Sequence, residues 1–209
     1  MNLDFEFFNK KFNVSRETIE KLNKYKDFLL TSNKSLNLIG KTTENQIFTR
    51  HFADSAQIYD LIEDKSEIID LGSGAGFPGI LLRILMDDKK ITGNIILIDK
   101  SYKKCRFLQD LSDKLSLNLK IVNLKIENYK FDKISTVVSR AFKKTIDTID
   151  ILFKNNDKIR NIILIKGKTY QQEIDDAKKK YTFDAEKFRS ITSDESYVLK
   201  IYNIKCSTT

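Results

Sequence analysis

Residues 68–79 read Ile68-Ile69-Asp70-Leu71-Gly72-Ser73-Gly74-Ala75-Gly76-Phe77-Pro78-Gly79, an apolar run that ends in a carboxylate and then a turn with four glycines. A second apolar stretch follows, which we expect to be helical. Because glycine lacks a Cβ, such a turn can adopt positive φ values and bring backbone N–H groups close to a ligand. The helix that follows points the positive end of its dipole at the same place. The segment therefore predicts a cofactor-binding loop between a strand and a helix.

Two cofactor classes fit this loop. Gly74, Gly76 and Gly79 satisfy the G-x-G-x-x-G pattern, so a dinucleotide is one of them. Asp70 argues against it, because a carboxylate in a partly dry cleft would repel a doubly charged pyrophosphate. The same carboxylate suits a cationic sulfonium group. We therefore expect S-adenosylmethionine, with Gly72 and Gly74 allowing its close approach.

From residue 66 on, short apolar runs alternate with helical stretches. The runs 66–71, 94–99, 119–123, 134–139 and 160–166 are typical of buried parallel strands. Two β-rich runs between about 186 and 206 predict an antiparallel hairpin at the sheet edge. The expected strand order is 3-2-1-4-5-7-6. We expect an α/β fold with helices on both faces of a mostly parallel sheet.

The first 65 residues predict a helical extension packed on that core, which leaves 66–209 as the S-adenosylmethionine-binding domain. Apolar residues at helical spacing after Ser15, a suitable N-cap, indicate a helix over 15–30. A second helix is expected from Thr43 to Glu63, with Thr43 and Gln46 as a capping box.

Several polar residues follow the predicted strands at the carboxyl edge, where doubly wound sheets bind their ligands. Asp99 ends the second strand, and a carboxylate there can accept both ribose hydroxyls of an adenosine. The turn Lys125-Ile126-Glu127-Asn128 would lie over the adenine. Arg140 and Lys166 end the fourth and fifth strands and are candidate site residues. Each of these side chains could instead be a solvated residue at a strand end.

The polar face of the predicted helix 43–63 is a candidate for the substrate side of the pocket. It holds Arg50, His51 and Asp54. Arg50 and Asp54 are four residues apart and could also be a plain surface ion pair. His51 is the only histidine, and a lone histidine in this setting is more often a structural hydrogen-bonding residue than a catalyst.

Charge and composition narrow the function class. The formal net charge is +8, and residues 66–209 contain 27 basic against 19 acidic residues, whereas residues 1–65 contain 10 of each. This excess suits a polyanionic partner such as nucleic acid. Two distant cysteines and no Cys/His cluster favour neither disulfides nor a metal site. No signal-peptide pattern or membrane-length apolar run is present, so a cytoplasmic protein without a membrane partner is expected.

The single proline, Pro78, limits the acceptor chemistry. The Asn/Asp-Pro-Pro-aromatic motif of many exocyclic-amine methyltransferases is absent from the sequence, and so is the Pro-Cys nucleophile of cytosine-C5 methylation. Guanine N7 needs neither, because it is a bare lone pair with no proton to remove. In-line attack by this atom requires mainly orientation and electrostatics, so no general base is expected.

The chain resembles the bacterial small-subunit ribosomal RNA guanine-N7 methyltransferases, the glucose-inhibited division protein B family. The matching segments are Asn37-Leu38, Arg50-His51-x-x-Asp54-Ser55, residues 70–79, Asp99-x-x-x-Lys103-Lys104-x-Arg106-Phe107-Leu108, Ser139-Arg140-Ala141 and Lys166-Gly167. Asn37-Leu38-Ile39-Gly40 and Lys103-Lys104 depart from the family's usual Asn-Leu-Thr and Lys-Arg.

This resemblance implies a Rossmann-like class I methyltransferase fold and methyl transfer to N7 of one guanine in 16S rRNA. It implies cofactor contacts by Gly72, Phe77, Ile126, Glu127 and Arg140. On the substrate side, Asn37, Arg50, His51 and Lys166 are the candidates. The expected partner is 16S rRNA or the small ribosomal subunit, and the protein is expected to act as a monomer.

Three other functions use many of the same features. An NAD-dependent oxidoreductase would share the glycine loop, and a small-molecule methyltransferase would share the cofactor. A binding module that has lost catalysis would bind RNA without methylating it. Thermal stabilisation by NADH would indicate the oxidoreductase, whereas thermal stabilisation by S-adenosylhomocysteine would indicate a methyltransferase.

Overall fold

The computed structural model describes residues 3–207, which contain a seven-stranded sheet in the order β3-β2-β1-β4-β5-β7-β6. The strands are β1 (Glu67–Leu71), β2 (Asn94–Asp99), β3 (Lys120–Asn123), β4 (Ser135–Arg140), β5 (Ile159–Lys166), β6 (Tyr181–Arg189) and β7 (Tyr197–Cys206). β1 to β5 are parallel, and β7 is antiparallel to both β5 and β6. The predicted strand order and the edge hairpin are confirmed, although β6 begins earlier than expected.

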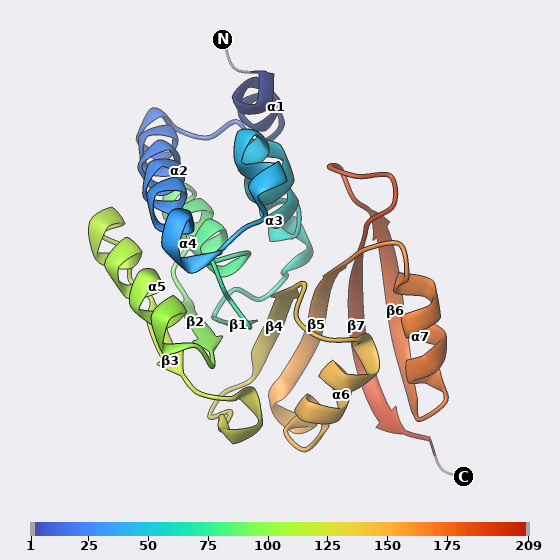
Figure 1. Cartoon of the computed structure of the whole chain (residues 1–209). Coiled ribbons are helices and arrows are strands. Elements are labelled where there is room, and N and C mark those ends of the chain that lie inside the picture. Colours follow the sequence, from blue (N-terminus) through green and yellow to red (C-terminus); the bar gives the residue numbers. More distant parts are fainter. Residues whose placement is uncertain (1–2, 208–209) are drawn as a thin grey trace.

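Helices cover both faces of the sheet (Figure 1). α4 (Gly79–Asp88) and α5 (Tyr102–Leu115) pack on one face, and α6 (Thr145–Phe153) and α7 (Tyr170–Lys178) on the other. Successive strand residues point to opposite faces, so Ile68 belongs to one apolar core and Ile69 to the other. This arrangement confirms the predicted doubly wound fold. It leaves the carboxyl ends of β1, β2, β4 and β5 on one edge.

The N-terminal part is helical and shares the core of the first face. It contains α1 (Leu3–Phe12) and α2 (Arg16–Leu36), followed by short pieces: η1 (Lys41–Gln46), η2 (Phe48–Ala53), α3 (Asp54–Ala56) and η3 (Tyr59–Leu61). Two further short turns, η4 (Ile126–Asn128) and η5 (Asn156–Lys158), lie within the sheet-forming part. The predicted Ser15 cap is confirmed, because its hydroxyl accepts from the Thr18 N–H at 3.2 Å. Phe8, Tyr25 and Phe52 lie in the same apolar cluster as Ile68 and Leu97, which ties this part to the sheet.

The expected continuous helix from Thr43 to Glu63 is wrong. The segment is broken into a 3-10 turn, a π-helix, a short α-helix and a second 3-10 turn. Thr43 does not form the predicted capping box, since its hydroxyl donates to Gly40 O instead. The start of η2 is capped from outside, because the Asp4 carboxylate accepts from the N–H groups of Phe48 and Thr49 at 2.8 and 2.7 Å. Contacts from α1 and from the sheet thus override the local helical pattern.

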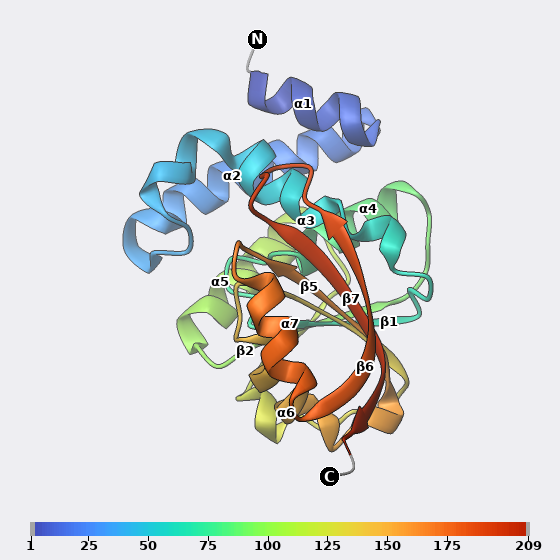
Figure 2. The same ribbon diagram turned by 90° about the vertical axis from the view of Figure 1, so that its right-hand side faces the viewer.

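The turn between β6 and β7 returns to this broken segment (Figure 2). Gln57 Nε2 donates to Ser190 Oγ at 3.2 Å, and the N–H of Ile191 donates to Gln57 Oε1 at 3.0 Å. Segments from both ends of the chain therefore meet beside the end of β4.

Among residues 3–207, the helices are all too short or too polar to span a bilayer.

Candidate functional site

The glycine turn after β1 has the backbone that the sequence predicts. Gly72, Gly74 and Gly76 have φ values of 66°, 58° and 97°. A Cβ on Gly72 would lie 2.5 Å from Phe142 Cδ2, whereas a Cβ on Gly74 would meet only Gly72 O, at 3.6 Å. Gly72 is thus covered by Phe142 from the loop after β4, and Gly74 borders open space.

Asp70 fixes this turn from beneath. Its Oδ2 accepts from Ser73 Oγ at 2.7 Å and from the Gly79 N–H at 2.9 Å, so it joins the turn to the start of α4. The side chain is fully buried and its Oδ1 has no partner among residues 3–207. Burial raises the Asp70 pKa to about 6, although both hydrogen bonds oppose this shift. Asp70 lines neither of the two cavities described below, so its first role is to hold the loop.

Asp99 connects the same turn to β2. Its Oδ2 accepts from the Gly74 N–H at 3.0 Å and its Oδ1 from the Ser101 N–H at 2.8 Å. Each carboxylate oxygen has two lone pairs, so both can still accept a ligand hydroxyl. The sequence predicted a carboxylate at this place but not that it organises the glycine turn.

Two cavities lie along the carboxyl edge of the sheet. The first, here called the glycine-turn cavity, has a volume of about 460 Å³, and its lining includes Gly72, Asp99, Ile126 and Glu127. These are four of the seven residues predicted to bind the cofactor. Gly74, Phe77 and Arg140 are not part of this lining.

The second, here called the Arg140 cavity, has a volume of about 530 Å³. Arg50, His51 and Lys166, three of the four predicted substrate-side residues, line it together with Arg140. Ala141, Phe142 and Lys143, the loop after β4, line both cavities. The two cavities therefore adjoin across this loop. None of its residues was predicted as a site residue, although its position after Arg140 could have indicated it.

Asn37, the fourth substrate-side candidate, lies at neither cavity. It is exposed and ends α2 in a left-handed conformation, with φ of 48°. Asparagine tolerates this conformation better than most residues, which explains its place here. Asn33, one turn earlier, exchanges two hydrogen bonds with the backbone of Ile39 at 2.9 and 3.1 Å.

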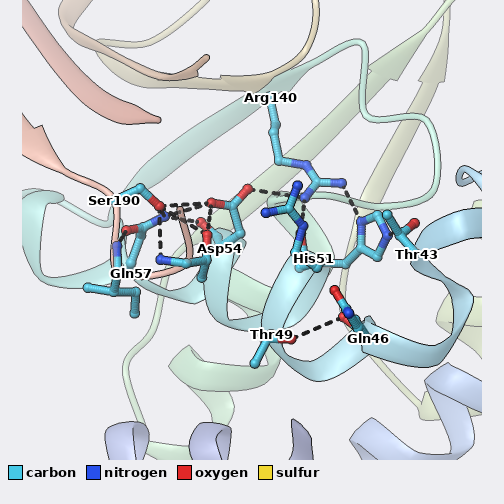
Figure 3. Close-up of polar contacts among 11 residues, drawn as sticks. Thr43, Gln46, Thr49, His51, Asp54, Gln57, Arg140 and Ser190 are labelled. Carbon is cyan, nitrogen blue, oxygen red and sulfur yellow. Dashed lines mark hydrogen bonds and ion pairs between the residues drawn. The ribbon is translucent and has the colours of Figure 1, made fainter. Parts of the chain in front are cut away.

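Arg140, at the end of β4, lines its cavity and binds three residues of the broken segment 43–63 (Figure 3). Its Nη1 donates to Asp54 Oδ2 at 3.2 Å and to the Arg50 carbonyl at 3.0 Å. Its Nη2 donates to His51 Nδ1 at 2.7 Å. Asp54 Oδ1 accepts from Gln57 and from Thr192 of the β6–β7 turn, both at 2.9 Å. Asp54 therefore pairs with Arg140, not with Arg50 as the spacing allowed.

Phe77 lies beneath Arg140. The guanidinium carbon is 4.9 Å from the ring centroid, and the Phe77 ring stacks on His51 and Tyr25 at 5.3 and 5.5 Å. Only 4% of Phe77 is exposed. This placement supports Arg140 and His51, which together with Asp54 are here called the Arg140 cluster. Contact between Phe77 and a cofactor stays a prediction.

His51 is neutral and bound at both nitrogens. Because arginine only donates, His51 Nδ1 accepts, and Nε2 carries the proton and faces Thr43 Oγ1 at 2.8 Å. Burial, and then the positive charges of Arg140 and Arg50, lower the His51 pKa from 6.5 to about 3. A histidine in this state cannot take up a proton near neutral pH. The sequence-based view of His51 as a structural residue agrees with this geometry.

This pKa predicts a pH effect on stability. Unfolded His51 binds a proton below about pH 6.5 while the folded protein does not, so histidine's contribution to stability is present above pH 6.5 and is lost as pH falls toward 3. The difference in unfolding free energy between wild type and His51→Gln should shrink by about 2 kcal/mol from pH 7 to pH 5. Denaturant unfolding at both pH values measures it. A difference independent of pH would contradict the neutral, buried histidine.

Lys166 also lines the Arg140 cavity. Its ammonium is 2.8 Å from Glu173 Oε2 and also donates to the Lys143 carbonyl. Burial raises the Glu173 pKa, but the hydrogen bond and charge of Lys166 and two bonds from Thr145 outweigh it, so the pKa lies below its ordinary value. Glu173 comes from α7, and no sequence pattern linked it to Lys166.

Asp99→Asn should weaken binding of S-adenosylhomocysteine by about 1.5–3 kcal/mol, the range for a lost charged hydrogen bond. The amide keeps the size of the side chain but has a single acceptor oxygen, so the turn and a ribose would compete for it. Calorimetric titration measures the dissociation constant, and Asp113→Asn, at an exposed position of α5, is the control. Equal affinity of the two variants would count against Asp99 as a ribose ligand.

Known proteins with similar sequences match most of this chain. The family model described as "rRNA small subunit methyltransferase G" (GidB) matches residues 18–199. Proteins named ribosomal RNA small subunit methyltransferase G are 36% identical over 200 residues in Pelagibacter ubique and 38% over 192 residues in Rickettsia akari. The first alignment covers 94% of this chain and 93% of the relative, and the second covers 91% and 97%.

Solved structures share the fold at low identity. Magnesium protoporphyrin IX methyltransferase from Synechocystis, solved with bound S-adenosylmethionine, superposes with a TM-score of 0.60 at 12% identity. The superposition covers 85% of this chain and 96% of the Synechocystis protein. An O-methyltransferase from Bacillus cereus, solved with S-adenosylhomocysteine, gives a TM-score of 0.56 at 13% identity over 86% and 91% of the two chains. These likenesses concern the fold alone.

Proposed function

The chain belongs to the rRNA small subunit methyltransferase G family, and we propose that it methylates N7 of a guanine in 16S rRNA. It is an rRNA methyltransferase that uses S-adenosylmethionine. The observation that supports the finer proposal most is the pair of adjoining cavities. One borders the glycine turn, and the other is bordered by arginine, lysine and a neutral histidine. Cofactor and nucleotide would meet at the loop 141–143.

The residues of the glycine-turn cavity fit this cofactor. Asp99 retains acceptor capacity for ribose hydroxyls, and Ile126 offers an apolar side chain beside Glu127 for an adenine. Asp70 lies outside the cavity lining, but its buried, unpartnered Oδ1 favours positive charge near the turn and disfavours a pyrophosphate there. When bound, S-adenosylmethionine supplies an electrophilic methyl group. Gly72 lines the cavity and would allow the cofactor to approach the backbone there, whereas Gly74 lies outside the lining and its N–H already donates to Asp99.

Arg140 and Lys166 would orient the guanine without blocking its nucleophile. Arginine often donates to both O6 and N7 of guanine, but a reacting N7 must keep its lone pair free. Arg140 uses one Nη2–H and the Nη1 group for His51, Asp54 and Arg50, so its rigid fork retains donors for O6, a phosphate or the cofactor. Lys166 lines the same cavity as a further cation.

We expect the rate of methyl transfer at saturating substrates to vary little between about pH 6.5 and 8.5. No proton leaves N7 in this reaction, and His51, with a pKa of about 3, does not titrate there. Single-turnover measurement isolates the chemical step, and His51→Gln should keep the same flat profile. A rate that rises tenfold per pH unit, and that His51→Gln flattens, would mean that N7 is the wrong acceptor.

Transfer of labelled methyl from S-adenosylmethionine to small subunits isolated from cells lacking this protein tests the proposed activity. The expected result is label in 16S rRNA. Label in a small molecule would support a small-molecule methyltransferase instead, and RNA binding without transfer would support a binding module that has lost catalysis. The small subunit or its rRNA is the proposed partner, and the monomeric state stays a prediction.

A further inference from the structure

Arg50 differs from the other arginines in its surroundings. Each of the other six arginines pairs with a carboxylate, at distances of 2.7 to 3.5 Å. Among residues 3–207, no carboxylate pairs with Arg50, whose side chain is exposed. Its backbone is nevertheless fixed, because its carbonyl accepts from Arg140. A guanidinium without a carboxylate partner, carried at a cavity by a fixed stretch of backbone, is suited to bind an anion.

Arg50 also borders a further cavity. This cavity, here called the Phe7 cavity, has a volume of about 530 Å³ and is lined by Asp4, Phe7, Gln46, Thr49, Arg50, Ile191 and Thr192. Arg50 and Thr192 line the Arg140 cavity as well. The two cavities are therefore neighbours with Arg50 on their common wall. A volume of this size is sufficient for a ligand as large as a nucleotide.

The lining of the Phe7 cavity has the chemistry of a nucleotide subsite. Phe7 is one of the exposed large apolar residues, at 38%, whereas the next aromatic residue of α1, Phe8, is completely buried. An exposed aromatic ring can stack on a nucleobase, and this stacking does not depend on which of the four bases is present. Gln46 is exposed and has both an amide donor and an acceptor for a base edge.

The frame of this cavity is held from within. Asp4 caps the start of η2 through the N–H groups of Phe48 and Thr49, which fixes α1 against η2. Its carboxylate would repel a phosphate placed deep in the cavity, so the phosphate belongs at Arg50 and the base near Phe7. η2 itself is a π-helix, a form that occurs frequently at functional sites.

We propose that the Phe7 cavity binds the RNA nucleotide next to the methylated guanine. Its base stacks on Phe7, its edge faces Gln46, and the phosphate that links it to the guanine lies on Arg50. This inference rests on the proposed function of the Arg140 cavity. It assigns α1, which the family match beginning at residue 18 does not include, to substrate recognition.

Steady-state kinetics with small subunits lacking the methyl group test the stacking contact. Phe7→Ala should raise KM for the subunit by about 5- to 150-fold, the range for loss of base stacking on alanine substitution. kcat and the affinity for S-adenosylhomocysteine should stay within twofold of wild type, and Phe7→Trp should restore KM. Ile134→Ala is the matched control, because Ile134 is also exposed, at 51%, and precedes β4 at the opposite edge of the sheet.

Salt dependence tests the phosphate contact. Arg50→Gln should raise KM and lower the slope of log KM against log salt by about 0.7, the value for one phosphate on single-stranded nucleic acid. Arg160, at the start of β5, pairs with Asp64, and Arg160→Gln removes the same charge as Arg50→Gln. The slope of log KM against log salt for Arg160→Gln should equal that of wild type. An unchanged slope in Arg50→Gln would overturn the phosphate assignment.

Ultraviolet cross-linking identifies what occupies the cavity. The tryptic peptide that ends at Lys10 should be recovered with an attached nucleotide from beside the methylated guanine. Its recovery attached to a ribosomal protein, or a Phe7→Ala KM equal to that of Ile134→Ala, would overturn the subsite. In both cases wild-type label transfer to 16S rRNA would persist, whereas failure of the proposed function would abolish that transfer.

Discussion

Gly72→Val should weaken binding of S-adenosylhomocysteine by more than 100-fold while the circular dichroism spectrum stays close to that of wild type. Two effects add at this position. The φ of 66° is an outlier for a β-branched residue, which costs of order 1–3 kcal/mol. The new Cβ would also lie 2.5 Å from Phe142 Cδ2, so Phe142, which lines the cavity that the cofactor is proposed to fill, would have to shift.

Gly40→Val is the matched control for this variant. Gly40 has a φ of −65°, and the nearest atoms to an added Cβ are two threonine hydroxyls at 3.9 Å. Its cofactor affinity should equal that of wild type. If Gly72→Val binds S-adenosylhomocysteine as tightly as Gly40→Val does, the glycine turn is not the cofactor loop.

Arg140→Ala should destabilise the protein by about 3 kcal/mol and reduce methyl transfer at least 100-fold. The change leaves Asp54 without its ionic partner, and both side chains are mostly buried, at 17% and 12% exposed. Removing one partner of a buried pair costs about 3–5 kcal/mol, and losing one donor from a preorganised site typically costs two to three orders of magnitude in rate.

The single histidine provides a direct readout of this cluster. Burial is the largest cause of the low pKa of His51 and Arg140 is the largest charge that adds to it, so Arg140→Ala should raise this pKa above about 3, as followed by the imidazole proton resonance. Arg160→Ala breaks a more exposed pair, at 48% and 35%, and should cost under about 1 kcal/mol and leave His51 unchanged. Equal stability losses with an unmoved His51 pKa would show that the Arg140 cluster is not a unit.

The sheet could be predicted from the sequence because its strands are short apolar runs between recognisable helices. The glycine turn, Asp99 and Arg140 were located by their positions at the ends of those strands. These features are local or follow from the general rule that parallel strands end at a common edge. Even α1 had a usable signal, with Phe5, Phe8 and Phe12 at helical spacing.

The broken segment 43–63 could not be predicted in this way. Its form depends on Asp4 capping η2, on Arg140 binding the Arg50 carbonyl, and on Thr192 and Gln57 sharing Asp54. Except for the bond between Gln57 and Asp54, each of these contacts joins residues that are distant in the sequence. Arg50 and Asp54 illustrate the consequence: their spacing suggested an ion pair, but the nearby Arg140 takes Asp54 and leaves Arg50 for another partner.

Mass mapping of methylated nucleosides in rRNA from cells with and without this protein tests the proposed activity most directly. The expected result is one 7-methylguanosine in 16S rRNA that disappears when the protein is absent and returns with wild type but not with Gly72→Val. An unchanged 16S rRNA pattern, or a lost methyl group on another atom or in another RNA, would contradict methylation of guanine N7 in 16S rRNA.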